Sequence, residues 1–244
     1  MTTWVGRPRV GSAGFPRPRQ ECYDLLAMVE VQQTFYHPLP LRTARALRQE
    51  APLAFDFMLR AWLLITHEPT HPSYRRLRFP IPDDRKEYFG AFQDTDEVWA
   101  AWQKTDEVAQ ALRARVIFFQ TPPRFEPTPA NVARVRSFFG QLERRDYLLA
   151  WDPRGNWPAE TLKPLCDELD LIHAVDPFVS RSLHGRRKYY RLTGMGDYRY
   201  QYTEPELDKL AALLRKNPGA YCLFANHYMF EDAKRLLERL TATG

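Results

Sequence analysis

Two carboxylates stand out among the residues whose type and position could do chemistry. Glu30 lies inside Met28–Tyr36 (MVEVQQTFY), an apolar and β-prone run, and an ordinary core strand has no need of a charge that must be desolvated. Asp152 directly follows another apolar run and precedes Arg154. Two such carboxylates can do general acid–base work if burial separates their pKa values. The alternative for Glu30 is an edge strand whose carboxylate lies in solvent.

Further polar residues stand at the carboxyl ends of the expected strands. Arginine binds phosphate or carboxylate through its planar fork, so this mixture predicts a pocket for a small anionic ligand, phosphorylated or carboxylated. Glu30 and Asp152 are the expected catalytic residues. The expected ligand-binding residues are Ser12, Gln32, Tyr36, Arg60, His67, Gln120, Arg154, Arg191 and Asn226. The alternative is that Glu30–Arg191 or Asp152–Arg60 are ion pairs that tie strand ends together.

The sequence leaves a divalent metal open and carries no nucleotide-cofactor motif. Carboxylates with a histidine could bind a metal, but no two candidate ligands have diagnostic spacing. His67 and His71 are four residues apart, as in a helical metal pair, yet Pro69 and Pro72 disfavour a regular helix there. A Gly-x-Gly-x-x-Gly run and a Gly-x-Ser-x-Gly elbow are both absent.

The composition is that of a soluble globular protein. The 244 residues fit one barrel-sized domain, expected over residues 1–244, with 44% hydrophobic and 27% charged residues. The formal charge of +5 permits contact with nucleic acid without requiring it. Three scattered cysteines, no signal-like start and no apolar run of membrane-spanning length predict a cytoplasmic protein with no membrane association.

Eight β-prone runs alternate with helical patterns almost throughout the chain. The runs are Arg7–Phe15, Met28–Tyr36, Ala54–Ala61, Arg115–Phe119, Tyr147–Trp151, Leu171–Val175, Tyr189–Leu192 and Ala220–Phe224. Alternation predicts parallel strands joined by crossover helices, and eight such strands close a TIM-type (β/α)8 barrel. The site of such a barrel lies at the carboxyl ends of the strands, so the polar residues above should converge on one mouth. The connection over Phe178–Lys188 is expected to be irregular.

Side chains that cap helices mark several helix starts. Asp94 with Glu97, and Thr203 with Glu206, are typical of capping boxes. Thr128–Pro129 is typical of an N-cap followed by proline at the first helical position. Other helices are expected over Arg19–Leu26, Leu41–Glu50 and Pro158–Leu169.

The Pro- and Arg-rich stretch Ile65–Gln93 has no clean period. A connection of this length is usually a functional loop or a lid, and the alternative is a solvated basic loop. Basic and aromatic residues interleave there, a mixture that suits the backbone and bases of nucleic acid. They are Arg75, Arg76, Arg78, Arg85 and Lys86 with Tyr74, Phe79 and Tyr88. Nucleic-acid binding, with or without phosphodiester cleavage, is therefore the alternative function.

Motifs along nearly the whole chain resemble the YecE-like family, also called domain-of-unknown-function family 72. The similar segments are Val10–Phe15 (family pattern V/I-G-T-S-G-W), Glu30–Tyr36 (V-E-V/I-N-x-T-F-Y, with Gln32 for Asn), Phe55–His67 (F-x-F-x-x-K…I-T-H, with Arg60 for Lys), Gln120–Phe125 (Q-x-P-P-x-F), Asp152–Trp157 (a shorter E-F-R-H-x-S-W), Arg191–Gly194 (R-L-H-G) and Phe224–His227 (Y-F-N-N). Gly155 and Thr193 stand where the family pattern has histidine. The Pro153-Arg154-Gly155 form looks like a separate branch.

The resemblance implies a TIM-type barrel, and the family-like positions coincide with the strand-end residues. It implies no reaction, because the family's activity is not established. An enzyme with this site would be a hydrolase or an isomerase or lyase. The two missing histidines imply a variant of the family's chemistry or none, so a non-catalytic scaffold with a degenerate pocket is a third interpretation.

Overall fold

A computed structural model describes residues 8–143 and 145–242 and has the (β/α)8 fold. Eight strands form one sheet in the order β6-β5-β4-β3-β2-β1-β8-β7. Strand pairs along this order are parallel, as between β1 and β2 and between β4 and β5. The barrel class that the sequence predicts is therefore confirmed. The ladder is open between β6 and β7, where Val175 forms one isolated parallel bridge with Tyr190.

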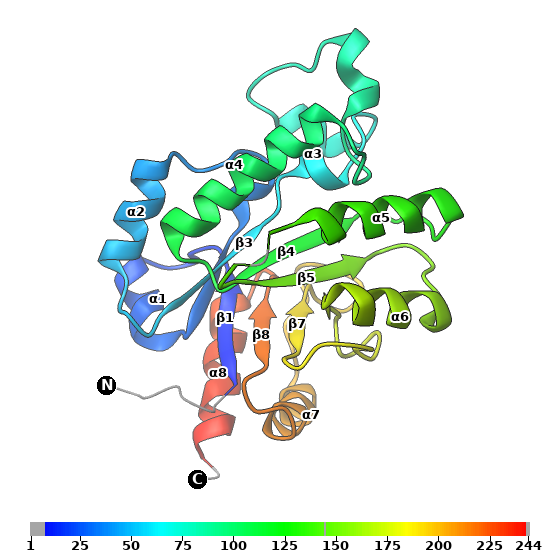
Figure 1. Ribbon diagram of the computed structural model, residues 1–244. Helices are drawn as coiled ribbons and strands as arrows, with labels where there is room; N and C mark the ends of the chain where they lie inside the picture. The colour runs from blue at the N-terminus through cyan, green and yellow to red at the C-terminus, as the bar shows by residue number, and fades with distance from the viewer. Residues whose placement is uncertain (1–7, 144, 243–244) are drawn as a thin grey trace. The chain divides into compact units, whose positions relative to one another are not determined.

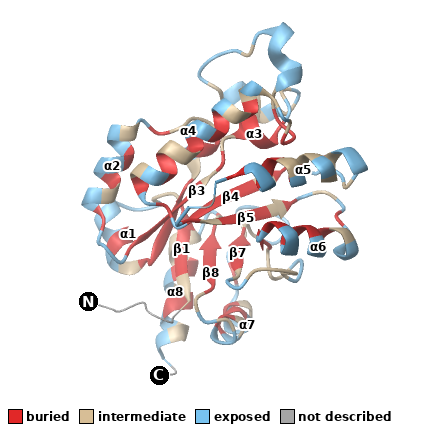
Figure 2. Cartoon of the chain, viewed as in Figure 1, coloured by how far each residue is buried: buried red, intermediate tan, exposed pale blue. Residues whose placement is uncertain are grey.

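The chain divides into two compact units, which are described separately. Unit 1 comprises the described residues of Met1–Val31, Ala51–Phe57 and Ile172–Gly244, and unit 2 comprises Gln32–Glu50 and Met58–Leu171. In both units the strands are almost wholly buried and the helices expose one face (Figure 2).

Unit 1 contains the strands on either side of β1. Its elements are β1 (Arg9–Ala13), α1 (Arg19–Leu25), β2 (Met28–Val31), β6 (Ile172–His173), β7 (Tyr189–Leu192), α7 (Glu204–Arg215), β8 (Tyr221–Phe224) and α8 (Met229–Thr241). The register pairs Ser12 with Val29 on one side of β1 and with Phe224 on the other. α8 packs against β1, β8 and α7.

Unit 2 is built on the ladder between β4 and β5. Its elements are η1 (Gln32–Phe35), α2 (Leu41–Glu50), α3 (Leu63–Thr66), η2 (Pro72–Arg76), η3 (Asp83–Tyr88), α4 (Asp96–Leu112), β4 (Val116–Thr121), α5 (Pro129–Gln141), β5 (Leu148–Pro153) and α6 (Ala159–Leu169). Strand β3 (Asp56–Arg60) begins in unit 1 and continues in unit 2. Helices α5 and α6 run beside β4 and β5 (Figure 1). Aromatic rings fill the layer between them: Phe119, Phe138 and Phe139 contact one another, and Trp151 contacts Phe139.

Several predicted boundaries move in the structure. The run Met28–Tyr36 is a strand only as far as Val31, because a 3-10 turn follows. The Thr34 hydroxyl fixes that turn by donating to the Arg60 carbonyl oxygen (2.8 Å) and accepting from the Arg60 N–H (3.1 Å). Strands β4 and β5 extend further than predicted and include Gln120 and Asp152. Arg7, the first residue of the first expected strand, lies outside the described residues.

The predicted helix caps are confirmed at two positions and wrong at one. Thr128 accepts from the Asn131 N–H, and Glu206 accepts from the Thr203 N–H at 2.8 Å within a capping box. Asp94 is not the N-cap of α4. That position belongs to Thr95, whose hydroxyl accepts from the Val98 N–H, while Asp94 accepts from the Trp99 indole.

The two irregular segments differ from each other in how they are held. Residues 178–188 contain no helix, as predicted, and are fixed by the buried His173, whose Nδ1 accepts from the Leu183 N–H (3.2 Å). The Pro- and Arg-rich segment begins at His67 rather than Ile65, because α3 includes Ile65 and Thr66. It extends away from α3 and α4 (Figure 1) and carries two 3-10 turns. Within the described residues, no helix is long and apolar enough to cross a membrane.

Candidate functional site

Glu30 is fully buried in unit 1 and is bound on both carboxylate oxygens. Arg191 donates from Nη2 to Oε1 (3.0 Å) and from Nε to Oε2 (3.2 Å), and the Tyr189 hydroxyl donates to Oε2 (3.0 Å). Arg191 is itself only 8% exposed. The edge-strand alternative is therefore wrong, and the geometry is that of a buried bidentate ion pair between β2 and β7. Tyr189 is a member of this group that the sequence pattern did not reveal.

Ser12 and Asn226, also in unit 1, are buried but bind separate partners. The Ser12 hydroxyl donates to the Gly14 carbonyl oxygen (2.8 Å). Asn226 donates from Nδ2 to the Tyr200 carbonyl oxygen (2.8 Å) and to Asp232 (2.7 Å), and burial raises the pKa of Asp232. Asn226 thus joins the loop after β7 to the first turn of α8. The sequence alone does not reveal this positioning role, because it depends on the contact with Asp232.

A chain of hydrogen bonds crosses the carboxyl ends of three strands in unit 2. Arg60 Nη2 at the end of β3 donates to Gln120 Oε1 on β4 (3.0 Å), and Gln120 Nε2 donates to Asp152 Oδ2 on β5 (2.7 Å). The register of β4 and β5 places Gln120 directly beside Asp152. Gln120 therefore bridges Arg60 and Asp152, the two residues for which an ion pair between strand ends is the alternative interpretation. The side chain of Asp152 keeps 20% of its surface exposed.

Other predicted ligand residues surround this chain in unit 2. Arg154 Nη1 lies 3.8 Å from Asp152 Oδ2, and its side chain is 48% exposed. The Arg60 guanidinium carbon lies 3.9 Å from the centre of the Phe35 ring, a cation–π contact. Tyr36 accepts from Arg76 through its hydroxyl (2.7 Å), while Gln32 is half-buried in the 3-10 turn after β2.

His67 is buried in unit 2 and packs against a second histidine. Its ring lies 4.5 Å from that of His71 and 5.1 Å from that of Phe35, centre to centre. Burial, with the charges of His71 and Arg60, lowers the pKa of His67 to about 3. The imidazole is therefore neutral at physiological pH, and its Nδ1 lies 2.8 Å from the Thr66 hydroxyl. The rings of His67 and His71 are in contact even though Pro69 and Pro72 lie in this segment and the two histidines do not share a helix.

Among residues 8–143 and 145–242, no three His, Cys, Asp or Glu side chains are grouped so that they could hold a metal ion. The three cysteines are buried thiols. Burial raises the pKa of Cys222, of Cys166 and of Cys22, which suits apolar packing rather than nucleophilic chemistry.

Gly155, which replaces a histidine of the family pattern, has a steric explanation. A Cβ atom there would lie 2.7 Å from the Phe125 carbonyl oxygen and 3.0 Å from that of Pro123. The same Phe125 oxygen accepts from the Trp157 indole (2.7 Å). The shorter loop after β5 thus brings backbone so close that no side chain fits at position 155 without a shift.

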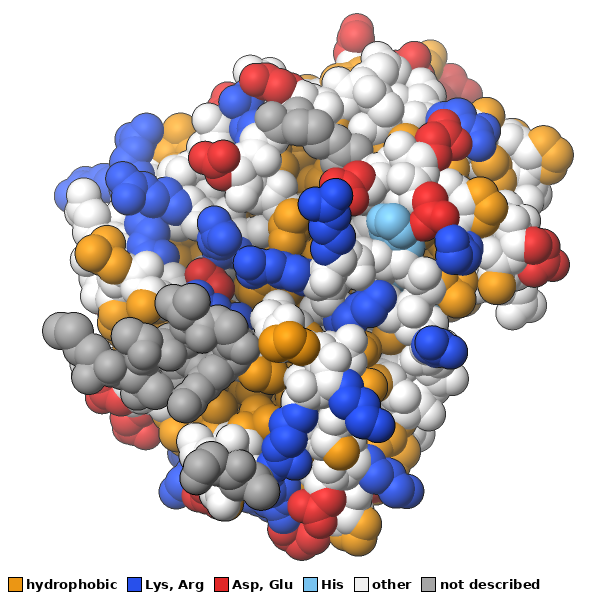
Figure 3. Space-filling view, turned by 60° about the horizontal axis from the view of Figure 1, so that its bottom comes forward, with side chains coloured by type: hydrophobic (Ala, Val, Ile, Leu, Met, Phe, Trp, Pro, Cys, Tyr) orange, Lys and Arg blue, Asp and Glu red, His pale blue; other side chains and the backbone are white. Residues whose placement is uncertain are grey.

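The basic residues of the Pro- and Arg-rich segment are largely engaged. Arg85 pairs with Glu97, Lys86 pairs with Asp83, and Arg76 stacks on Tyr36 with its guanidinium carbon 3.8 Å from the ring centre. Phe79 and Tyr88 are exposed. Lys and Arg side chains are prominent on the face drawn in Figure 3, in keeping with the formal charge of +5. Nucleic-acid binding stays a prediction.

The strand order, with polar groups at the carboxyl ends of β2 to β5, β7 and β8, defines a (β/α)8-barrel protein. The chain belongs to the family described as "Protein of unknown function DUF72", whose model matches residues 19–243. The resemblance read from the sequence motifs is thereby confirmed.

Solved structures show the same fold at low sequence identity. A DUF72 family protein from Enterococcus faecalis V583 is 15% identical, with 97% of each chain covered and a TM-score of 0.72. A DUF72 family protein from Thermotoga maritima MSB8 is 16% identical, with 96% of this chain and 99% of that one covered and a TM-score of 0.67. A xylose isomerase domain containing protein from Salmonella typhimurium LT2 is 13% identical, with coverage of 99% and 98% and a TM-score of 0.60. No curated protein matches the chain.

Proposed function

We propose that unit 2 binds a small anionic ligand, phosphorylated or carboxylated, at the carboxyl ends of β3, β4 and β5. The observation that carries this proposal is the chain Arg60–Gln120–Asp152, in which an amide holds a guanidinium and a carboxylate at fixed positions on neighbouring strands. Arg60 and the half-exposed Arg154 supply the charge and planar donors that suit an oxyanion.

Asp152 is the acid–base residue of this proposal. It lies between Gln120 and Arg154, keeps part of its surface open, and stands at the strand end where barrel enzymes place their chemistry. His67 supplies a neutral imidazole near Arg60. We assign Glu30 and Arg191 to the stability of unit 1 rather than to chemistry, because they satisfy each other and are buried.

Anion binding by matched variants tests this proposal. Acetate and inorganic phosphate are titrated into the protein, and binding is followed by NMR chemical shifts. Arg60→Met is expected to weaken both anions by about tenfold or more, since a charge-assisted bond is lost. Asp152→Asn is expected to retain or tighten anion binding, because it removes a negative charge, and to abolish any turnover found. Arg136→Met, at an exposed arginine on α5, is the control. Unchanged binding of both anions by Arg60→Met refutes the proposal.

A further inference from the structure

Aromatic and basic side chains of unit 2 meet on one surface, here called the Arg76 surface: Tyr36, Trp62, Arg76, Arg78 and Phe79. The Arg76 guanidinium carbon lies 3.8 Å from the centre of the Tyr36 ring, and Arg76 Nη1 donates to the Tyr36 hydroxyl (2.7 Å). The Trp62 indole donates to the Tyr36 carbonyl oxygen (3.0 Å), and its ring centre lies 6.1 Å from that of Phe79. These contacts bring three rings and a guanidinium group to one place, with Arg78 next to Phe79 along the chain.

The Arg76 surface is open to solvent. The Phe79 side chain is 42% exposed, Arg76 and Arg78 are exposed, and Tyr36 and Trp62 are half-buried. The N–H group of Trp62 and the hydroxyl of Tyr36 are already used within the protein. A ligand at this surface therefore meets aromatic ring surface and guanidinium groups.

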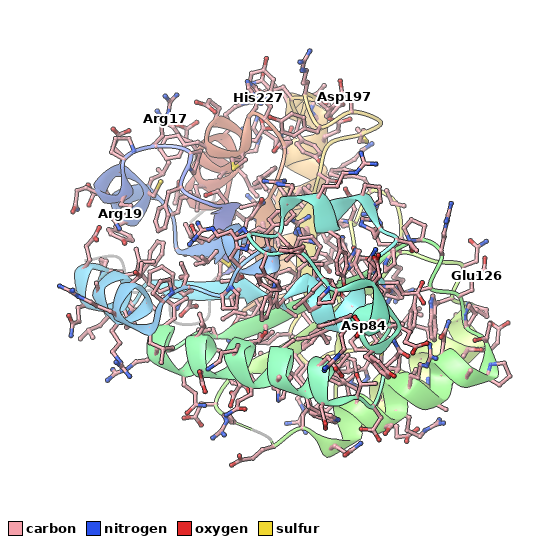
Figure 4. All side chains as sticks on the ribbon, turned by 90° about the horizontal axis from the view of Figure 1, so that it is seen from above. Arg17, Arg19, Asp84, Glu126, Asp197 and His227 are labelled. Carbon is pink, nitrogen blue, oxygen red and sulfur yellow. The ribbon has the colours of Figure 1, made fainter. Side chains whose placement is uncertain are left out.

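The two segments that carry most of this surface contain no acidic residue. Gln32–Gln49 and Pro69–Pro82 each contain arginines and no Asp or Glu. The next acidic residues after the second segment are Asp83, which pairs with Lys86, and Asp84, which is labelled in Figure 4. Both segments therefore supply positive charge and no carboxylate of their own.

The contacts of the two arginines orient their charge without neutralising it. Arg76 is held by an aromatic ring and a hydroxyl, which fix the position of the guanidinium group and leave its charge in place. Burial and the charges of Arg78 and Arg76 lower the pKa of His37, so both arginines act on the residue that follows Tyr36. Positive charge is thus concentrated beside the exposed ring of Phe79.

We propose that the Arg76 surface binds single-stranded nucleic acid. Phe79 and Trp62 stack against bases, because every base has a π-face, and Arg76 and Arg78 bind the phosphate backbone. A small anion or an acidic peptide would use the guanidinium groups and gain little from the rings. This inference goes beyond the small-anion site proposed above and does not depend on its residues.

Two labelled oligomers that differ only in their bases test this inference by fluorescence anisotropy. Oligothymidylate and an abasic oligomer of equal length carry the same phosphates, and wild-type protein should bind the first about tenfold more tightly through stacking. Phe79→Ser should weaken oligothymidylate about fivefold or more and leave the abasic oligomer nearly unchanged. Tyr88→Ser, at an exposed ring of η3 outside the Arg76 surface, is the matched control and should alter neither. Retained binding of the abasic oligomer shows that Phe79→Ser is folded.

Salt dependence supplies a second readout. Neutralisation of about three phosphates by Arg75, Arg76 and Arg78 predicts that affinity falls about twentyfold between about 50 and about 200 mM salt. Arg78→Met should reduce the slope of log affinity against log salt concentration by about 0.7, because one phosphate contact is lost. Arg136→Met, at an exposed arginine of α5, is the control and should leave the slope unchanged.

Several results would overturn the inference. They are no binding of either oligomer, equal affinity for the two oligomers, equal effects of Phe79→Ser and Tyr88→Ser, and an affinity that does not fall with salt. Tighter binding of polyglutamate than of oligothymidylate would also overturn it and would assign the surface to an acidic protein partner. Each of these results leaves the proposed small-anion site standing, because titration with acetate and inorganic phosphate tests that site through Arg60→Met.

Discussion

Replacing Glu30 by glutamine should destabilise the protein far more than its small change in volume suggests. In the wild type, the Glu30 carboxylate accepts hydrogen bonds of 3.0 and 3.2 Å from the Arg191 guanidinium, which is 8% exposed. The substitution removes the negative charge of Glu30 and leaves the positive charge of Arg191 buried. Loss of one partner of a buried pair typically costs about 3–5 kcal/mol. Tyr189 loses a charged acceptor as well, so we expect a loss in the upper half of that range.

Urea unfolding followed by tryptophan fluorescence measures this loss as a change in the free energy of unfolding. The double variant Glu30→Leu with Arg191→Met removes both charges and should recover to within about 2 kcal/mol of the wild type. The surface pair Arg136–Glu168 is the matched control, with side chains 52% and 46% exposed. Glu168→Gln should cost less than about 1 kcal/mol. A loss below about 1 kcal/mol for Glu30→Gln, or a double variant no more stable than the single one, would refute the assignment of Glu30 to stability.

Three further substitutions test other parts of the fold. Gly90→Ala should destabilise by more than about 2 kcal/mol in thermal or urea unfolding, because φ is +83° and a Cβ would lie 2.1 Å from the His67 carbonyl oxygen. Burial and the charge of Lys188 lower the pKa of His173 from 6.5 to about 4. As the pH falls, the unfolded chain therefore takes up a proton at this histidine before the folded protein does. The free energy of unfolding should fall by up to about 3 kcal/mol between pH 6.5 and pH 4. His173→Gln should flatten that slope, and an unchanged slope contradicts the pKa assignment. Thr128→Ala should cost about 1 kcal/mol through the lost N-cap of α5, and a neutral result would contradict it.

The barrel could be predicted from the sequence because its signals are local. A strand–helix alternation and capping residues such as Thr128 and Thr203 depend on neighbours a few residues away. The same locality explains the errors. Thr95 displaces Asp94 as the N-cap of α4 because Asp94 is taken by the Trp99 indole, a choice that residue type alone does not decide. Likewise β2 ends at Val31 because the Thr34 hydroxyl binds backbone 26 residues away.

The candidate site was predicted as a set of residues but not as a set of contacts. Strand ends gave Arg60, Gln120 and Asp152, since parallel strands bring their carboxyl ends to one edge. That Gln120 bonds to both Arg60 and Asp152 depends on how far side chains reach across two strand spacings, which the sequence does not record. The spacing of His67 and His71 suggests a helical metal pair, and Pro69 and Pro72 disfavour that helix. A loop, not a helix, brings the His67 and His71 rings into contact, so the helical spacing of four residues does not explain why they are neighbours.

The two missing histidines of the family pattern bear on which groups remain for proton transfer. At Gly155 the backbone of Phe125 occupies the space of a side chain, and the Trp157 indole holds that backbone in place. The loss of histidine there belongs to a repacked loop, so restoring it by a single substitution would force the loop apart. Without that histidine, the acid–base candidates that remain near this part of unit 2 include the carboxylate of Asp152 and the imidazoles of His67 and His71. Since burial and positive charge keep both imidazoles neutral, they act as hydrogen-bonding groups until an anion offsets that charge. An anion bound beside these two rings would raise the pKa of both imidazoles, so proton uptake would accompany its binding.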